Sequence, residues 1–138
     1  MVTARERQVF DQLLDEAIAG LPPHIHELLE EVPLIVEDEP DPALRGEVLG
    51  EAGGDLCGLH WGVPLTCRSV ESTPDLPDRM MLFRGPILRL SGYRHAGPGL
   101  GRQRGLAELR RQIKITLLHE IGHHFGLDES QLEALGYG

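Results

Sequence analysis

Five consecutive residues near the end of the chain, His119-Glu120-Ile121-Gly122-His123, restrict the local structure more than any other stretch. An α-helix turns about 100° per residue, so histidines four apart project from one face and both imidazoles can reach one metal ion. Glu120 sits beside this pair, where its carboxylate can accept a proton from metal-bound water. The spacing therefore predicts a helix that carries a metal site.

Gly126 lies three residues after His123. It predicts that the helix ends in a left-handed turn, which directs the chain back toward the metal. Acidic side chains come directly afterwards and are candidates for a third ligand. Asp128 fits the N-cap of a final helix, which leaves Glu129 as the freer carboxylate. Glu133, one helical turn further on, is the other candidate.

The metal-bearing helix is expected to span residues 102–125, because apolar residues recur at helical spacing along it. Its main stripe consists of Leu106, Leu109, Ile113, Leu117, Ile121 and Phe125. Ile115 and Leu118 lie off this stripe and widen the apolar surface near the histidines. The C-terminal half of the helix is therefore expected to be buried on most sides.

This expected burial favours a metal ion over a purely structural role for the polar residues. Burying His119, Glu120 and His123 together costs several kcal/mol of desolvation unless the three groups satisfy one another. A cation between them removes that cost. His124 is interpreted as an exposed or hydrogen-bonded residue without a metal role.

Earlier segments predict two more helices and several short strands. Thr3 and Glu6 form a capping box ahead of an amphipathic helix that Gly20 closes, and a second helix starts near Pro23. Strands are expected over residues 32–37, 56–65 and 79–84, whereas residues 86–90 fit an edge strand or a helical turn. Glycine- and proline-rich connections over 38–55 and 92–101 are long enough to reach over a cleft.

The charge distribution argues against nucleic acid as a partner. The formal net charge is −9, with 14 acidic against 3 basic residues over 1–55 and 8 against 10 over 56–138. Nucleic-acid binding needs clustered Lys and Arg, so the acidic half is interpreted as solvated surface. We expect no nucleic-acid partner.

Length and composition predict one domain over residues 1–138 with a single modest core. No apolar run is long enough to cross a bilayer and no apolar segment of a signal peptide opens the chain, so we expect no membrane association and a cytoplasmic location. Cys57 and Cys67 are expected to be reduced thiols without a metal role.

The stretch HEIGHHFGLDE resembles the extended signature of the minimal zincin-like metallopeptidases. The resemblance extends to the opening helix, VEDEP, GLHWGVPLT and the strand followed by FRGPILR. It implies an α+β, compact zincin-like domain in which a small mixed sheet packs against helices and the active-site helix lies near the C-terminus. Glu129 stands where the wider pattern HExxHxxGxxH/D has His or Asp.

The same resemblance implies a mechanism and a substrate class. One zinc ion would be held by His119, His123 and Glu129, with Glu120 as the general base that activates water for hydrolysis of a peptide or protein substrate. Residues 79–84 are the candidate edge strand that aligns the peptide. Residues 93–95, Tyr-Arg-His, are candidate stabilisers of the oxyanion.

Two functions from other classes compete with this one. A metal-dependent RNA hydrolase with a similar histidine spacing lacks the glutamate after its first histidine and ends its motif in histidine, so Glu120 and Glu129 argue against it. A zinc-binding module without catalysis has the same ligands as a peptidase. Replacement of Glu120 by Gln distinguishes the zinc-binding module from the peptidase.

Overall fold

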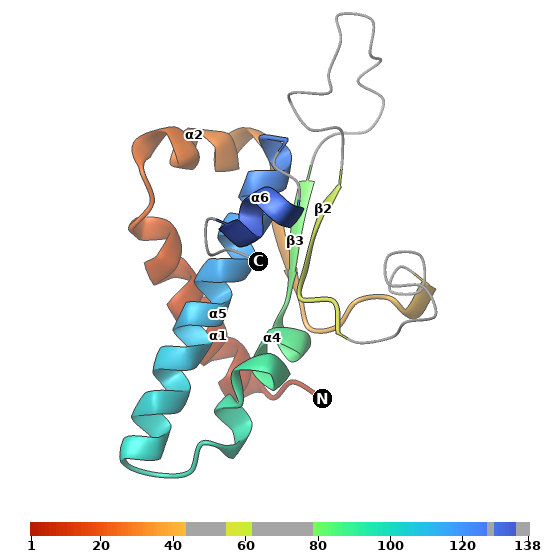
Figure 1. Cartoon of the computed structure of the whole chain (residues 1–138). Helices are drawn as coiled ribbons and strands as arrows, with labels where there is room; N and C mark the ends of the chain where they lie inside the picture. Colours follow the sequence, from red (N-terminus) through yellow and green to blue (C-terminus); the bar gives the residue numbers. More distant parts are fainter. Residues whose placement is uncertain (44–54, 62–78, 127–128, 135–138) are drawn as a thin grey trace, which may run out of the picture.

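The computed structural model describes residues 1–43, 55–61, 79–126 and 129–134, except for the side chains of Trp61, Glu129, Leu132 and Glu133 (Figure 1). Its elements are α1 (Ala4–Ala19), α2 (Pro23–Glu31), β1 (Leu34–Glu37), β2 (Gly58–Trp61), β3 (Arg79–Phe83), α4 (Arg84–Ser91), the 3-10 helix η3 (Tyr93–His95), α5 (Leu100–His124) and α6 (Glu129–Ala134). Most of the connection predicted at 38–55 and the end of the strand predicted at 56–65 lie outside the described residues, as does Cys67.

The three described strands form one mixed sheet in the order β1-β3-β2. β1 runs parallel to β3, with Leu34 opposite Met80, and β2 runs antiparallel to β3, with Gly58 opposite Leu82. α5 packs against β2 and β3, and α1 packs against α5 (Figure 1). This confirms the α+β class with a small mixed sheet.

The position of the third strand corrects one prediction. Residues 79–84 were expected to form an edge strand, whereas β3 is central and pairs on both sides. Its continuous apolar run is the physical reason, because Met80 to Phe83 are all buried and a strand covered on both faces does not alternate polar and apolar residues. Among the described residues, β2 is the edge strand next to α5.

The core joins α5 to the sheet and to α1. Four residues of the predicted stripe are buried, namely Leu109, Ile113, Leu117 and Ile121, and they pack in one cluster with Phe10 of α1 and Met80 of β3. The predicted stripe is wrong at its last member, since Phe125 is 40% exposed. Burial of this stripe fixes the direction in which the remaining sides of α5 point.

The segment after β3 proves to be a helix. Residues 86–90 were compatible with an edge strand or a helical turn, and the structure places them in α4, which Gly92 ends in the left-handed conformation. Arg84, the first residue of α4, donates to Asp11 of α1 at 2.9 Å and to Asp38 at 3.1 Å. These ion pairs connect the start of α4 to α1 and to the residue after β1.

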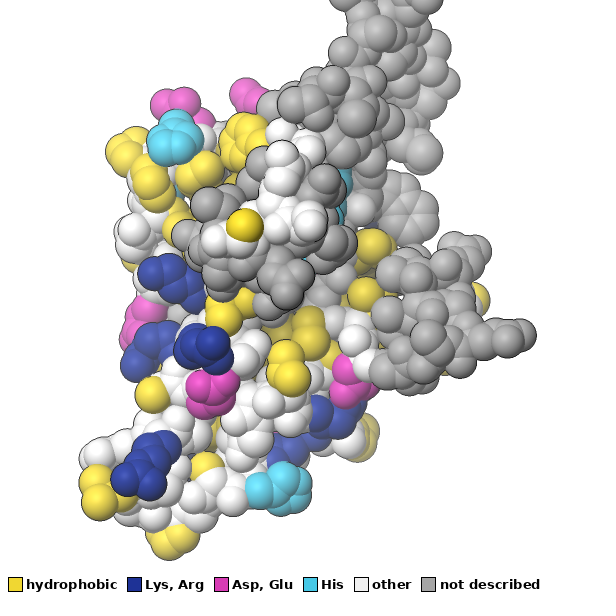
Figure 2. Space-filling view, in the orientation of Figure 1, with side chains coloured by type: hydrophobic (Ala, Val, Ile, Leu, Met, Phe, Trp, Pro, Cys, Tyr) yellow, Lys and Arg dark blue, Asp and Glu magenta, His cyan; other side chains and the backbone are white. Residues whose placement is uncertain are grey.

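The outer face of α5 carries mixed charges. Figure 2 shows basic and acidic side chains interspersed on the helical side of the molecule, with hydrophobic side chains at the surface near α4 and α5. None of the described helices is long and apolar enough to cross a membrane.

The first helix starts as predicted. Glu6 accepts from the Thr3 N–H at 2.9 Å, and the Glu6 N–H donates back to the Thr3 hydroxyl at 3.1 Å. Glu6 also accepts from Arg94 of η3 at 2.7 Å, and this hydrogen bond is the main reason that the pKa of Glu6 lies below its usual value. One carboxylate therefore closes the cap and joins α1 to η3.

Glu6→Gln is expected to lower the free energy of unfolding at neutral pH by about 1 kcal/mol, because the charge-assisted bond to Arg94 becomes a weaker one. The folded-state pKa of Glu6 lies below the ordinary value of 4.5, so this stabilisation is present above that pH and is lost as pH falls through the lowered pKa. Urea denaturation at neutral and acidic pH measures both effects. Glu27→Gln, at an exposed position of α2, is the control, and equal acid sensitivity of Glu6→Gln and wild type would contradict the prediction.

Candidate metal centre

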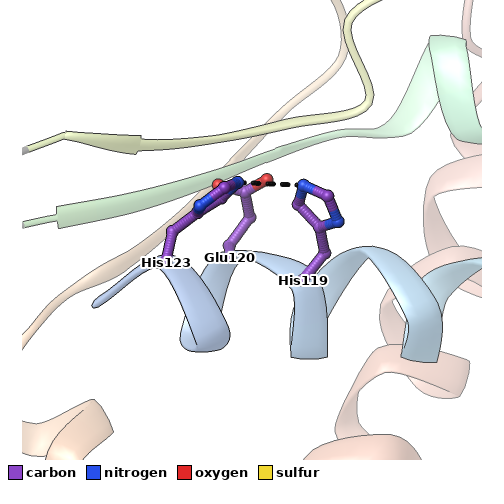
Figure 3. Close-up of side chains that lie close together, drawn as sticks. All are labelled: His119, Glu120 and His123. Atoms are coloured by element: carbon purple, nitrogen blue, oxygen red, sulfur yellow. Dashed lines mark hydrogen bonds between the residues drawn. The ribbon is translucent and has the colours of Figure 1, made fainter. Parts of the chain in front are cut away.

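The two histidines of the motif converge at the C-terminal end of α5. The Nε2 atoms of His119 and His123 lie 3.0 Å apart, and the two rings meet edge to face with centroids 4.6 Å apart (Figure 3). Both residues are half-buried. The predicted one-turn spacing therefore brings two imidazole nitrogens to one point.

Zinc fits this pair of nitrogens. Two Zn–N bonds of about 2.0–2.1 Å at a tetrahedral angle place the nitrogens roughly 3.3 Å apart, which is close to the separation in the structure. One donor atom from each of His119, Glu120 and His123 lies within 4.8 Å of the other two. Imidazole nitrogen together with carboxylate oxygen is a donor set that Zn²⁺ accepts.

Glu120 is 5% exposed, and its Cγ atom lies close to Gly58 of β2. Its carboxylate is drawn beside the two facing imidazoles in Figure 3. A buried carboxylate loses much of its hydration, and a divalent cation on the neighbouring histidines would stabilise its charged form. The arrangement therefore suits a carboxylate that works next to a cation without needing to be one of its ligands.

Close packing against Gly58 holds Glu120 in place. A Cβ atom at residue 58 would lie 2.9 Å from Thr116 Cγ2, 3.1 Å from Glu120 Cγ and 3.0 Å from the Met81 carbonyl oxygen. Contacts this short exclude any larger residue without a shift of the strand or the helix. Gly58 thus permits β2 to lie directly on the face of α5 that carries Glu120.

The turn after α5 has the predicted geometry. Gly126 has a φ of 86°, and its N–H donates to the carbonyl oxygen of His123 at 2.9 Å. The next described residue, Glu129, begins α6. Asp128 and the side chains of Glu129 and Glu133 lie outside the described part of the chain, so the third ligand stays a prediction.

The residues suggested as oxyanion stabilisers are far from this centre. Tyr93 packs near Gly105, in the second turn of α5, and Arg94 is bound to Glu6. Because α5 has 25 residues, its two ends are roughly 37 Å apart. The idea that the connection over 92–101 reaches the site is therefore wrong: this segment joins the other end of the helix.

A second pair of histidines lies beside the site and was not predicted. His124 is 2% exposed, and its ring meets that of His60 on β2 edge to face, with centroids 5.5 Å apart. Thr116, Glu120 and His124 follow one another at four-residue intervals, which is a polar stripe on one helical face. Together with the alternation of Gly58 and His60 in β2, this stripe is the sequence signal for the contact.

Comparison with known proteins agrees with the geometry. The model of a protein family described as "zincin-like metallopeptidase" matches residues 29–138. The match includes the sheet, α4 and the whole of α5, while α1 precedes it. No curated protein matches the chain significantly.

Gly58→Ala is expected to reduce the free energy of unfolding by about 1–3 kcal/mol, because the added methyl group overpacks the contact between β2 and α5. Chemical denaturation measures this loss. Gly20→Ala is the matched control, since its nearest neighbours would lie 3.7 and 3.8 Å from the new Cβ atom. The packing described for Gly58 is incorrect if both variants are as stable as the wild type.

Proposed function

The chain belongs to the zincin-like metallopeptidase family, and we propose from this membership and from the site that it hydrolyses peptide bonds with one zinc ion. The observation that supports the proposal most directly is the convergence of His119 and His123, whose Nε2 atoms lie 3.0 Å apart, beside the buried Glu120. Two imidazoles and an adjacent carboxylate are the groups that hydrolysis by activated water requires.

The proposed ligands are His119, His123 and Glu129. Three protein ligands leave a coordination position for water or substrate, as catalytic zinc sites do. When bound, zinc would supply Lewis-acid chemistry. It would make a water molecule acidic enough to lose a proton at about pH 7, and it would polarise the substrate carbonyl. Glu129 is chosen as the third ligand because it stands at the last position of the family pattern. The left-handed turn at Gly126, which redirects the chain after the helix, also supports this choice.

Glu120 is the proposed general base. Its carboxylate oxygens accept a proton from the attacking water and then donate that proton to the nitrogen of the leaving amine. Packing against Gly58 limits the positions that the side chain can adopt, which keeps the carboxylate beside the histidines. A fixed proton acceptor reduces the entropy lost in reaching the transition state.

The main chain of β2 is the proposed binding edge for the substrate. The N–H of Phe83 donates to the Cys57 carbonyl oxygen at 2.9 Å, so in this antiparallel ladder the main-chain groups of Gly58 and His60 point away from β3. An extended peptide that pairs with these groups would run alongside the site. This role replaces the one predicted for residues 79–84.

Replacement of the histidines and of Glu120 should have different effects. His119→Ala is expected to lower the zinc content from about one ion per chain to nearly none, since a site with one imidazole fewer binds weakly. Glu120→Gln is expected to keep its zinc and lose activity by about a hundredfold or more. Metal analysis after dialysis and cleavage of a mixed peptide library measure the two effects.

The exposed His26 on α2 provides the control His26→Ala, which should behave as wild type in both assays. Unchanged zinc content in His119→Ala would remove this residue from the site. Zinc binding without peptide cleavage in the wild type would favour the non-catalytic zinc-binding module.

The third ligand can be identified by comparing three substitutions. Glu129→Gln is expected to weaken zinc binding by more than the roughly 10- to 100-fold that loss of an outer hydrogen-bond partner causes. Asp128→Asn and Glu133→Gln should weaken it less. Competition with a chelator of known affinity ranks the variants, and the largest loss in either of the latter two would transfer the role of ligand to that residue.

A further inference from the structure

A pocket of about 220 Å³ opens directly beside the proposed catalytic group. Three elements line it: β2 with the residue before it, α4, and one face of α5. The lining residues are Cys57, Gly58, Leu90, Gln112, Ile115, Thr116, His119 and Glu120. Because His119 and Glu120 belong both to this pocket and to the metal centre, whatever fills it lies next to the reacting bond.

Away from His119 and Glu120, the polar side chains of the lining are hydrogen-bonded within α5 or uncharged. The Thr116 hydroxyl donates to the Gln112 carbonyl oxygen at 2.8 Å, and the Gln112 amide nitrogen donates to Glu108 at 2.9 Å. Burial raises the pKa of the Cys57 thiol to about 11, so this thiol is uncharged at neutral pH. The interior away from the metal centre is therefore apolar in character.

The lining also disfavours charged side chains of a ligand. Among the described residues that line it there is no Lys or Arg, and the only carboxylate is Glu120, at the end where the reaction would occur. An acidic side chain in the pocket would meet this carboxylate and find no cation among the lining residues. A basic side chain would lose its hydration over most of its length, which is costly without a partner.

A group of ion pairs connects α4 to the segment before β2, the two pocket walls other than α5. Arg89, next to Leu90 in α4, donates to Asp55 just before β2 at 2.9 Å and to Glu39 at 2.6 Å. Leu90 itself is 60% exposed at the pocket. The pocket thus has a defined width and an apolar rim, and hydrophobic side chains at the surface near α4 and α5 are visible in Figure 2.

We propose that this pocket selects the substrate by accepting one uncharged, apolar side chain, of the size of Leu, Met or Phe, from a residue that flanks the scissile bond. The volume supports a single side chain, because pockets for whole drug-sized ligands have roughly 300–1,000 Å³. The inference rests on the proposed peptidase function. It adds Leu90 and Ile115 as residues that determine specificity.

Peptide selectivity is the first test. With a degenerate peptide library, the zinc-loaded protein should prefer Leu, Met or Phe over Ala at one position next to the cleaved bond by about tenfold or more, as one missing methylene in an apolar pocket can cause. Ile115→Trp fills the pocket and should shift that preference toward Ala and Gly. Leu90→Ala should weaken the preference severalfold, while Leu100→Ala, at a leucine that is 71% exposed at the start of α5, should not change it.

Binding without catalysis is the second test. In a Cys67→Ser background, Cys57 is the only thiol, and its alkylation by N-ethylmaleimide reports access to the pocket. N-acetyl-leucinamide should slow this reaction at least about twofold at a concentration where the aspartate side-chain analogue N-acetyl-aspartamide does not, since only the former fits an apolar lining.

The outcomes separate the two proposals. Equal labelling of Cys57 with both compounds would overturn the pocket proposal, whether or not peptides are cleaved. Selective protection with no cleavage of any peptide would refute the peptidase function and support the apolar pocket. Cleavage with equal rates for apolar and acidic residues on both sides of the bond would leave the peptidase function intact and overturn the pocket's role in selection.

Discussion

The structure around the metal centre depends on how the free-energy cost of burying ionisable groups is compensated. Glu120 is almost fully buried and the two motif histidines are half-buried, and such groups are stable in an apolar setting only with charge or hydrogen-bond compensation. The proposed zinc ion would supply that compensation at one point. The rest of the fold serves to keep α5 in the orientation that maintains this convergence.

Two neighbouring stripes on the buried side of α5 have different roles. The stripe of Leu109, Ile113 and Leu117 packs against α1 and the sheet, and its burial makes rotation of the helix costly. The face with Thr116 and Glu120 meets β2 at Gly58, where only a residue without a side chain fits. The proposed general base, the proposed substrate-binding strand and one wall of the pocket therefore meet at a single contact between α5 and β2.

Local features of the fold were predictable from the sequence, and non-local ones were not. The capping box at Thr3, the course of α5 and the left-handed turn at Gly126 depend on residues within a few positions of one another. Strand order depends on pairing across the chain, so β3 was placed at an edge although its unbroken apolar run is typical of a central strand. Tyr93 was linked to the site through proximity to the start of α5, but the length of that helix separates them.

The proposed coordination of zinc can be measured directly by X-ray absorption spectroscopy at the zinc edge of the loaded protein. Two imidazole nitrogens at about 2.0–2.1 Å, completed by oxygen ligands, are expected, and one imidazole contribution should disappear in His123→Ala. A sulfur ligand at about 2.3 Å would place the metal on a cysteine. That result, or a spectrum unchanged by the substitution, would contradict a metal centre built on the two histidines of α5.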